Sequence, residues 1–531
     1  MRDAAGTLRE LRRLELSEIY DIAVVGSGFA GSLLAMIARK LGRSVILIEK
    51  GTHPRVVIGE SSTPLSNLLL EELTIRYGLT ELRPLAKWGS WRRSYPEITC
   101  GLKRGFTFHH HVLGASSSGD NERQDQLLVA ASPRDEIADT HWYRADFDHL
   151  LVREAQRLGV EYVDQVSLKQ FRDGAEEATI EGERDGREVQ FHARFVVDAT
   201  GPRGFLYHAL GLRELELPDY PRTQGLYSHF TGASRLEGTS WSRIGEPPPY
   251  PIDDAAVHHV FDGGWVWVLQ FNNDVTSAGV AATDEFASRL RFSDGAEAWS
   301  RVVEMIPALK EQFAEARAIR PFVHMRRMAF RSADVAGERW ALLPSAAGFV
   351  DPLLSTGIPL TLLGVSRIAE IIERDWCTQR FNERLQAYAQ QTDRELTATA
   401  RLIGALYANM NNFPVFVALT LLYFAAASFS EAARRLGKPH RAESFLLCDD
   451  PAFGPVCARL IERSRHPLSE VESNCLIEDV LNAIERINVA GLGRRERRNW
   501  YPVYADDLLS AAGKLGASRE DIHSLLRRCG F

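Results

Sequence analysis

The stretch DIAVVGSGFAG, residues 21–31, decides the fold of this chain. It begins with a short apolar run of the buried-strand type, and a periodic segment with the spacing of a helix, 32–41, follows it. Gly26 permits a tight turn, Gly28 lets the backbone approach a pyrophosphate, and Gly31 lets the helix pack on the strand. The free N–H groups at the start of the helix attract such an anion. The stretch therefore predicts a dinucleotide-binding unit.

A second apolar strand, 44–48, supports this prediction because it ends in Glu49, which Lys50 follows. An acid about 20 residues beyond the glycines accepts hydrogen bonds from ribose hydroxyls and disfavours a 2′-phosphate. An ordinary glycine-rich turn is the alternative. The order of strand, glycines, helix, strand and acid favours the nucleotide site.

NAD and FAD share this fingerprint, and later segments distinguish them. Residues 55–64, RVVIGESSTP, form a loop of small residues ahead of a predicted helix, 65–77. Residues 195–201, FVVDATG, and 340–349, WALLPSAAGF, are apolar strands that end in small residues, and a helix is predicted over 361–375. Three separated segments that return to one nucleotide site are typical of the large α/β fold that binds FAD.

Composition narrows the classes of function. The 531 residues allow two or three domains, and the net charge of −7 with mixed signs leaves no basic surface for nucleic acid or an anionic membrane. The six cysteines include no Cys-x-x-Cys pair, so they indicate neither zinc nor disulfides and fit a reducing cytoplasm. Segment 1–19 lacks the apolar centre of a signal peptide and predicts a short helix or arm. The longest apolar run, 413–427, is shorter than the roughly 18 to 20 residues that cross a bilayer and predicts a buried helix started by Pro414.

Two further motifs make a family resemblance specific. Lys103 stands in GLKRGFTF, residues 101–108, and Trp265-Val266-Trp267 stands on a predicted strand. With these motifs, most of the chain, from Ile19 to about Phe445, resembles the flavin-dependent halogenases, and the match is closest to the branch that acts on pyrroles and phenols. The resemblance implies a Rossmann-type FAD-binding fold of the glutathione reductase class, and an oxidoreductase of secondary metabolite biosynthesis.

The resemblance also assigns roles to residues. It implies that Lys103 is catalytic, that backbone amides at Thr356 and Gly357 hold chloride or bromide, and that Arg144 contacts FAD. The cofactor-binding candidates are Gly26, Gly28, Ala30, Gly31, Glu49, Lys50, Ser61, Arg144, Ala199, Gly201, Ser345, Gly348, Asp351 and Gly357. The candidates for lining the tunnel or the substrate site are Glu60, Ser62, Thr63, Pro64, Trp265, Trp267 and Ser355.

The chain departs from the family pattern at two places. The family signature Trp-x-Trp-x-Ile-Pro ends here in Gln270 instead of proline, and this signature is associated with the suppression of monooxygenase activity. A Gly-Asp-Ala stretch of the family is replaced by residues 343–346, LPSA, so that Ser345 takes the place of an acid near the ribityl chain. We expect weaker FAD binding from the second change.

The chemistry of halogenation requires a cation at the site. Reduced flavin and oxygen oxidise a halide to hypohalous acid, a small neutral oxidant that has to be held near the substrate. A lysine can hydrogen-bond this acid or form a haloamine with it, and burial lowers its pKa toward neutrality. The alternative for Lys103 is a surface position beside Arg104, as for most lysines. Lys87, near Trp88 and Trp91, is the second candidate lysine.

Histidines and tryptophans allow other interpretations. Only His109 and His111 of the run 109–111 can share one side of a strand, and we expect structural or substrate-lining roles for them and for His258-His259, with no metal site. Trp265 and Trp267 face one side of a strand, which is typical of a core aromatic pair. The resemblance makes them a wall between flavin and substrate instead.

The expected architecture has three parts. A discontinuous FAD-binding domain takes residues 18–84, 126–205 and 325–375, a substrate sheet domain takes 85–125 and 206–324, and a helical region, 376–531, caps the substrate site. Amphipathic periods predict helices at 381–407, 431–436, 455–463 and 476–487, with a terminal helix in 515–531. The arginines of segment 491–498 form a basic loop. It is either a solvated linker or a docking site for an acidic carrier protein that bears the substrate.

Three functions fit these observations. The first is a halogenase that uses FAD reduced by a separate flavin reductase, oxygen and chloride or bromide on an electron-rich aromatic ring, either free or bound to an acyl or peptidyl carrier protein. The second is a flavin monooxygenase or oxidoreductase on the same scaffold. The third is a non-catalytic protein that binds FAD.

Overall fold

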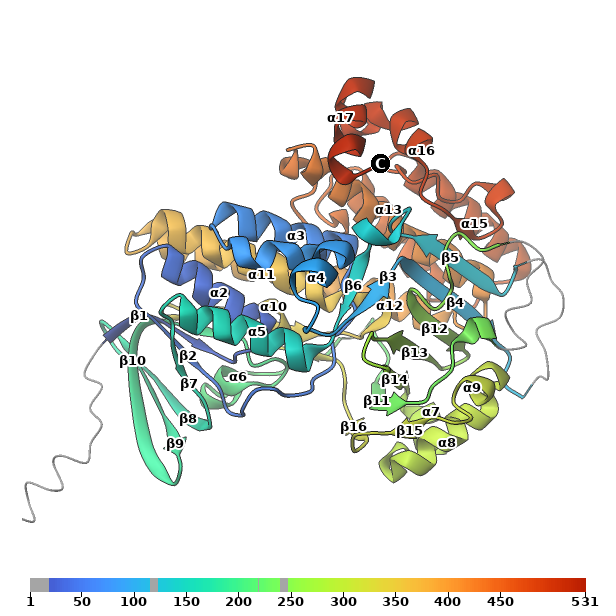
Figure 1. Ribbon diagram of the computed structural model, residues 1–531. Helices are drawn as coiled ribbons and strands as arrows, with labels where there is room; N and C mark the ends of the chain where they lie inside the picture. The colour runs from blue at the N-terminus through green and yellow to red at the C-terminus, as the bar shows by residue number, and fades with distance from the viewer. Residues whose placement is uncertain (1–18, 115–122, 218, 239–246) are drawn as a thin grey trace, which may run out of the picture.

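The computed structural model describes residues 19–531 apart from 115–122, 218 and 239–246, so almost all of the expected leading segment lies outside the described residues. Figure 1 shows the sheet that begins the chain at one end of the molecule and a larger sheet at the other. The C-terminal helices lie above the larger sheet in this view.

The first sheet brings the three predicted segments to one edge. Its order is β7 (Glu161–Val163), β2 (Val45–Ile48), β1 (Ile19–Val25), β10 (Arg187–Asp198), β9 (Ala178–Arg184) and β8 (Val166–Asp173), and β18 (Trp340–Leu342) also pairs with β10. β1 pairs in parallel with β2 and β10, and β10 does so with β18. Parallel strands end at the same edge, so the residues that follow Val25, Asp198 and Leu342 meet there. This confirms the predicted α/β fold.

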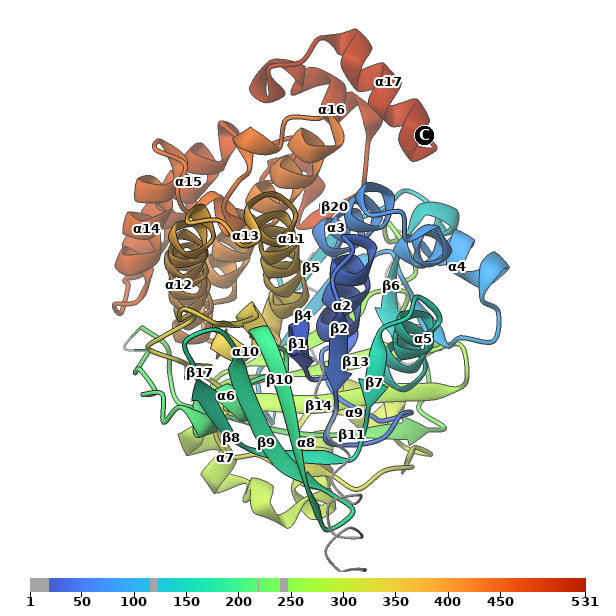
Figure 2. The same ribbon diagram turned by 90° about the vertical axis from the view of Figure 1, so that its left-hand side faces the viewer.

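Helices cover this sheet. α2 (Phe29–Lys40) packs against both α5 (Arg144–Arg157) and α11 (Gly357–Asp375), and α3 (Pro64–Arg76) packs against α11 (Figures 1 and 2). Shorter helices are α4 (Trp88–Ser94), α6 (Phe205–Ala209) and α10 (Pro344–Ala347). α2 begins directly after the glycine turn, with residues 30 to 38 buried, and this places its N-terminus at the sheet edge.

The second sheet has an apolar face on each side. Its order is β15 (Arg317–Ala318), β11 (Thr223–Thr231), β14 (Val275–Thr283), β13 (Gly264–Gln270), β12 (Ala256–Phe261), β4 (Gly105–His111), β5 (Gln126–Ala130) and β20 (Trp500–Tyr501), with β16 (Val323–Met325) beside β11. One face buries Val266 and Phe230 against α8 (Ala296–Met305), with α7 (Asp284–Arg289) and α9 (Pro307–Gln312) nearby. The other face carries Phe106 and Phe108, whose rings contact Phe424 and Phe416 of α13 (Phe413–Arg435).

Two strands modify the expected domain division. The sequence predicts that a segment of the FAD-binding domain starts at residue 126. β5 instead pairs with β4 in the second sheet, so this segment starts after residue 130. β20 pairs with β5, so the C-terminal region supplies a strand as well as helices. A separate ladder joins β3 (Cys100–Lys103) to β6 (Asp139–Trp142), and another joins β17 (Phe330–Arg331) to β19 (Gly348–Phe349).

The C-terminal region forms α12 (Arg380–Ala408), α13, α14 (Phe453–Ser464), α15 (Glu470–Glu485), α16 (Ala505–Ser510) and α17 (Arg519–Cys529). Pro414 lies in the first turn of α13, as predicted. The separate helix expected at 431–436 is wrong, because these residues continue α13, which ends before Gly437. The sequence between Pro414 and Gly437 has no helix breaker, so one helix forms.

Within the described part of the chain, two helices are long and apolar enough to span a bilayer, Leu353–Asp375 and Phe413–Arg435. Their most apolar windows are 72% and 83% buried inside the protein, respectively. Packing against the sheets and the other helices therefore accounts for their composition.

Candidate active site

The glycine turn has the geometry that a dinucleotide cradle needs. Gly26 adopts φ +97°, and a Cβ there would lie 2.8 Å from the backbone of Ala199. A Cβ on Gly31 would lie 1.9 Å from the Gly26 carbonyl oxygen. Only glycine permits this turn and this contact between helix and strand.

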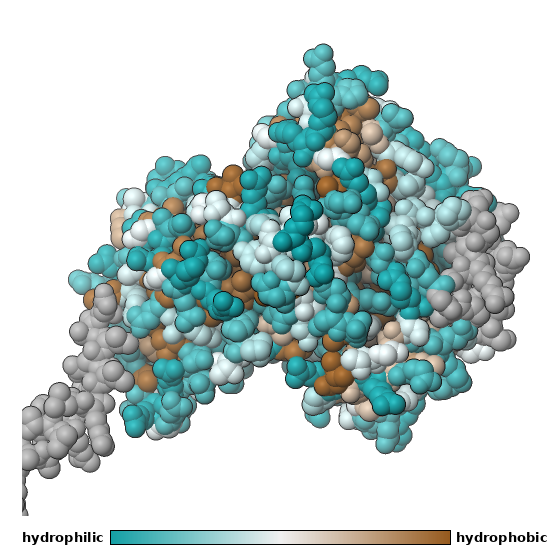
Figure 3. Space-filling model, viewed as in Figure 1, coloured by the Kyte–Doolittle hydropathy of each residue, from teal (hydrophilic) through white to brown (hydrophobic). Residues whose placement is uncertain are grey.

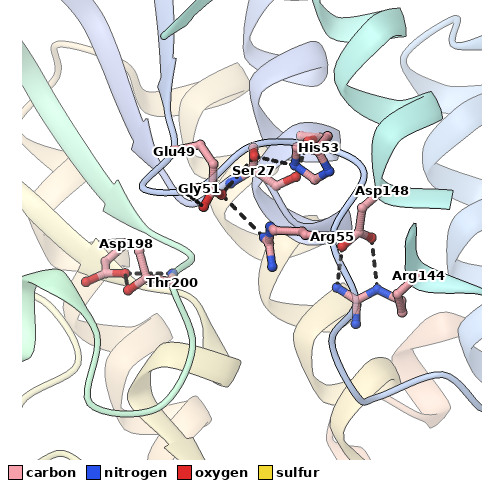
Figure 4. Close-up of polar contacts among 10 residues, drawn as sticks. Ser27, Glu49, Gly51, His53, Arg55, Arg144, Asp148, Asp198 and Thr200 are labelled. Carbon is pink, nitrogen blue, oxygen red and sulfur yellow. Dashed lines mark hydrogen bonds and ion pairs between the residues drawn. The ribbon is translucent and has the colours of Figure 1, made fainter. Parts of the chain in front are cut away.

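Glu49 organises the loop beside this cradle (Figure 4). Its carboxylate accepts hydrogen bonds from Ser27 N and Ser27 Oγ, both at 2.8 Å, and from Gly51 N at 3.0 Å, and it pairs with Arg55 at 3.3 Å. Burial alone would raise the pKa of Glu49, but Arg55 and these donors outweigh it and hold the pKa below its ordinary value. Lys50, the neighbouring candidate, is exposed.

A cavity of about 470 Å³ opens at the sheet edge. It is lined by Gly28, Ala30, Glu60, Ser61, Arg144, Ala199, Gly201, Trp265, Trp267, Ser345, Gly348, Asp351, Ser355, Thr356 and Gly357, all of which the sequence predicts for the flavin or the tunnel. We call it the flavin cavity. Ser62, Thr63 and Pro64, predicted with Glu60 and Ser61, lie beyond it.

Two guanidinium groups flank the glycine turn. A Cβ on Gly28 would lie 3.4 Å from Arg144 Nη2 and 3.7 Å from Arg55 Nη2. Arg144 is held by Asp148 at 2.9 and 2.8 Å and donates to the carbonyl of Gly59 at 3.1 Å (Figure 4). Sequence reasoning missed Arg55, although the segment that contains it was singled out. Paired cations and a helix N-terminus suit a pyrophosphate, so this cavity fits FAD.

The loop from Asp351 to Gly357 forms another wall of the flavin cavity. Leu354 and Ser355 both adopt left-handed conformations, with φ +62° and φ +54°, before α11 begins at Gly357. Asp351 fastens the loop because its carboxylate accepts a hydrogen bond from Leu353 N at 2.8 Å. Strained backbone of this kind persists only where the surroundings hold it.

Two tyrosines from distant elements hold Asp351. Tyr220 Oη donates to it at 2.7 Å and Tyr407 Oη at 2.9 Å, while Trp265 Nε1 donates to Tyr407 Oη at 3.2 Å. Burial raises the pKa of Asp351 to about 6, although these donors oppose the shift. Nothing local in the sequence pointed to either tyrosine.

Lys103 is fully buried, so the surface interpretation is wrong. Its Nζ donates to Ser61 Oγ at 2.7 Å and to the Ser62 carbonyl at 2.6 Å, and it lies 3.7 Å from the centre of the Phe106 ring. Across the β3–β6 ladder its partner is Asp139, which accepts a hydrogen bond from Asn67 Nδ2 at 2.8 Å. Burial lowers the pKa of Lys103 and raises the pKa of Asp139. The attraction between the two opposite charges acts against both of these shifts.

A second cavity, of about 200 Å³, lies beyond Lys103, and we call it the outer cavity. Thr63, Pro64 and Phe106 line its inner end, while α13 and the C-terminal residues form other walls. Ser61 lines the flavin cavity, so the lysine that contacts both Ser61 and Phe106 stands between the two cavities. Lys87, the second candidate lysine, lines the outer cavity.

Comparison with known proteins explains this arrangement. Residues 137–413, more than half of the chain, match the tryptophan halogenase family, and residues 21–240 match a FAD binding domain family. The chain belongs to the tryptophan halogenase family. It is a FAD-dependent oxidoreductase of the flavin-dependent halogenases, as the sequence predicted.

Individual relatives resemble this halogenase over most of its length. It is 28% identical to tetracycline 7-halogenase of Kitasatospora aureofaciens over 77% of this chain and 73% of the relative. It is 29% identical to monodechloroaminopyrrolnitrin halogenase of Pseudomonas fluorescens over 70% of this chain and 65% of the relative. The crystal structure of halogenase PltM in complex with phloroglucinol and FAD superposes with a TM-score of 0.79 at 23% identity, covering 90% of this chain and 99% of that one. The superposition confirms the fold.

The tryptophans of this halogenase form part of the flavin cavity. Trp265 and Trp267 face the same side of β13, as their spacing predicts, with ring centres 5.7 Å apart. Gln270 ends the strand, and its carbonyl oxygen lies so close to Gly101 that a Cβ there would stand 2.1 Å away. Among the described residues, Gln270 Nε2 has no hydrogen-bond partner. Gln270, which stands where the family has proline, therefore lies against β3, the strand that carries Lys103.

The histidines lie on both faces of the second sheet. His111 Nε2 lies 2.9 Å from His259 Nδ1, and burial lowers the pKa of His109 to about 4 and that of His111 to about 3. His258 instead stacks on Phe108, with ring centres 4.4 Å apart. In the part of the chain that the structure describes, no group of three potential ligands is arranged to hold a metal.

The predicted basic loop is engaged within the protein. Arg494 and Arg497 both pair with Asp507, at 2.8 and 2.6 Å, and Arg495 lies 3.6 Å from Glu478. Asp507 and Glu478 thus offset part of the charge of the four arginines in this loop, which reduces the field available to attract an acidic carrier protein.

Proposed function

We propose that this halogenase transfers chlorine or bromine to an electron-rich aromatic ring, a phenol or a pyrrole, through hypohalous acid held by Lys103. The observation that carries the proposal is the position of the Lys103 ammonium, buried between the flavin cavity and the outer cavity. Its Nζ contacts Ser61, which lines the first cavity, and Phe106, which lines the second, so the proposal places this cation on the path of an oxidant from the first cavity to a ring in the second.

The flavin cavity would hold FAD, with Arg55, Arg144 and the start of α2 at the pyrophosphate and Glu49 beside the ribose. Bound FAD, reduced by a separate flavin reductase, supplies the oxidation of halide by oxygen. Backbone amides at Thr356 and Gly357, at the start of α11, would hold the halide, because a helix N-terminus favours an anion.

Lys103 would act on the halogen transfer itself. Its ammonium donates a hydrogen bond to the oxygen of the hypohalous acid and so polarises the halogen–oxygen bond. As the ring carbon bonds to the halogen, the halogen–oxygen bond breaks, and the leaving hydroxide takes a proton from the ammonium to form water. The proton that the ring carbon loses replaces the one that the Lys103 ammonium donated. Asp139 stabilises the ammonium form across the ladder.

The test is mass spectrometry of products from purified protein with FAD, a flavin reductase, NADH, oxygen, bromide and a panel of phenols and pyrroles. A bromine isotope doublet that is lost in Lys103→Ala and kept in Lys87→Ala supports the proposal. A doublet lost only in Lys87→Ala would move the role to Lys87. Repeating the assay with the same phenols and pyrroles attached to a carrier protein would show whether the enzyme uses the free or the carrier-bound substrate. We expect the free form, because Arg494 and Arg497 of the basic loop pair with Asp507.

Monooxygenation is the second candidate, because Gln270 presents an unpaired buried amide nitrogen next to the lysine strand. Gln270→Leu removes this polar group. If oxygenated products or hydrogen peroxide dominate in the wild-type protein and fall in Gln270→Leu, the monooxygenase function replaces the halogenase. An unchanged product ratio would count against any role of Gln270.

A further inference from the structure

The side of the outer cavity that α13 forms is aromatic at one end and charged at the other. The residues of this wall are Tyr423, Phe424, Ala427, Ser428, Glu431, Ala432 and Arg435, which share one face of the helix. At the inner end the Phe424 ring lies 5.1 Å from that of Phe106, the ring beneath the Lys103 ammonium. At the far end the wall is an ion pair.

This ion pair is built into the helix. Arg435 Nε lies 2.8 Å from Glu431 Oε1, and Arg435 Nη1 lies 3.4 Å from Glu71 Oε2 on α3. The two side chains are only 19% and 24% exposed, which holds the carboxylate at the cavity wall. Among the described residues that line the outer cavity, Glu431 has the one carboxylate side chain. The described residues supply no donor to its Oε2.

A second polar group in the same cavity lacks a partner. Ser132 lines the cavity wall and is 4% exposed, and its Oγ makes no hydrogen bond within the described residues. Buried polar groups are normally satisfied, so this hydroxyl is available to a water or to a polar group of a bound molecule. Most of the remaining lining is apolar.

The distance along α13 suits one substituted ring. Phe424 and Glu431 are seven residues apart, which is roughly 10 Å of helix at about 1.5 Å per residue. Glu431 and Arg435 also act electrostatically on Asp139, the ladder partner of Lys103, so the ion pair and the lysine belong to one electrostatic environment.

We propose that Glu431 Oε2, positioned by Arg435, accepts a hydrogen bond from an O–H or N–H group of the substrate and so directs the ring toward Lys103. The proposal rests on the proposed halogenase function and specifies its substrate class, aromatic rings with a hydrogen-bond donor. A carboxylate on such a donor also raises the electron density of the ring, which favours attack on the halogen.

Two ring compounds of similar electron density test this. Phloroglucinol has three hydroxyl groups, and 1,3,5-trimethoxybenzene has no donor. Bromination of each is measured in the reductase-coupled holoenzyme for the wild-type protein, Glu431→Gln and Glu431→Leu. Glu72→Gln is the matched control, because Glu72 pairs with Arg434 of the same helix at 2.8 Å but does not line the cavity. Calorimetric titration of each ring compound into the FAD-loaded proteins measures binding without turnover.

We expect Glu431→Gln and Glu431→Leu to lower kcat/KM for phloroglucinol about 10- to 100-fold, the cost of losing a hydrogen bond to a charged group. The trimethoxybenzene rate should change less than about 3-fold, and Glu72→Gln should match the wild type for both. Phloroglucinol bromination and binding that survive both substitutions would overturn the proposal. If no protein brominates either compound, the proposed function fails, and weaker phloroglucinol binding by Glu431→Gln alone still supports the recognition role. Equal binding of phloroglucinol by the wild-type protein and by Glu431→Gln would reject the recognition role.

Discussion

The buried pair of Lys103 and Asp139 sets the charge at the centre of this site. Asp139 raises the pKa of Lys103, which burial lowers. If the ammonium form polarises the hypohalous acid, activity falls as pH rises through the pKa of Lys103. Asp139→Asn removes the supporting charge, so the alkaline limb of the kcat/KM profile should move to lower pH. The pKa of Lys103 is lowered to about 7, so the measurement is bromination from pH 5 to pH 9. An alkaline limb at the same pH in Asp139→Asn and in the wild-type protein would show that Asp139 does not set the pKa of the titrating group.

The buried charges of Lys103 and Asp139 should lower the free energy of unfolding. Lys103 and Asp139 are two opposite buried charges that interact across the ladder, and replacing such charges by apolar or neutral groups of similar shape often gains about 1 to 4 kcal/mol. Lys103→Met with Asp139→Asn should therefore raise the free energy of unfolding while it abolishes halogenation. Either single substitution leaves one buried charge and should destabilise the fold, which urea denaturation of the three variants would show.

The pH dependence of this gain has a definite sign. The folded pKa of Lys103 is lowered, so the wild-type penalty from the lysine grows as pH falls from about 10.4, its unfolded value. The folded pKa of Asp139 is raised, so the penalty from the aspartate grows as pH rises from about 3.9. The stability gain of the double variant should be largest near neutral pH and should shrink in both directions. A gain that does not vary with pH would exclude this origin.

At the scale of elements, the loop from Asp351 to Gly357 depends on a tyrosine of α12. Tyr407→Phe removes one of three donors to the Asp351 carboxylate and should destabilise the protein by about 1 kcal/mol. The loop carries the proposed halide amides, so the KM for bromide should rise several-fold while FAD affinity changes little. Tyr388→Phe is the control, because Tyr388 also lies in α12 but donates to the Leu342 carbonyl, away from this loop. Equal halide KM values in both variants would refute the role.

Local pattern predicted most elements of the cofactor fold, because strand, turn and helix signals act over neighbouring residues. Gly26 and Gly31 were predicted with their physical roles, and β1 and α2 formed as expected. The same reasoning split α13, because a change from apolar to amphipathic pattern within one helix looks like a boundary. The sequence does not predict the pairing of β5 with β4, because residues 112–125 between the two strands carry no periodic signal.

The candidate site was predictable only where a motif surrounds the residue. The motifs identify both Arg144, which lines the flavin cavity, and Lys103, which contacts one lining residue of each cavity. Asp139, Tyr220 and Tyr407 act through contacts between segments far apart in the chain, and no pattern in the sequence records such contacts. Glu431 was part of a predicted amphipathic helix, but only the packing of α13 shows which face lines a cavity.

At the scale of the whole molecule, segments far apart in the chain meet at the outer cavity. Its lining runs from Thr63, at the start of α3, to Phe531. Figure 3 shows apolar residues at the surface among the C-terminal helices at the top of that view. Tyr504 and Phe531, both lining residues, are 56% and 44% exposed, so the cavity opens beside the C-terminal helices. We therefore propose that the C-terminal region controls what enters the outer cavity.

This arrangement predicts that α17 sets the size of substrate. Leu526 lines the outer cavity and is 6% exposed, whereas Ile522 of the same helix is fully buried and does not line it. Leu526→Ala and Ile522→Ala should each lower the free energy of unfolding by about 2 to 5 kcal/mol, because each deletes buried methyl groups. Only Leu526→Ala enlarges the cavity, so only it should shift bromination toward bulkier phenols. The ratio of kcat/KM for a naphthol to that for a simple phenol measures this shift. If both variants change the ratio equally, loss of stability and not cavity size is the cause, and the C-terminal region does not select the substrate.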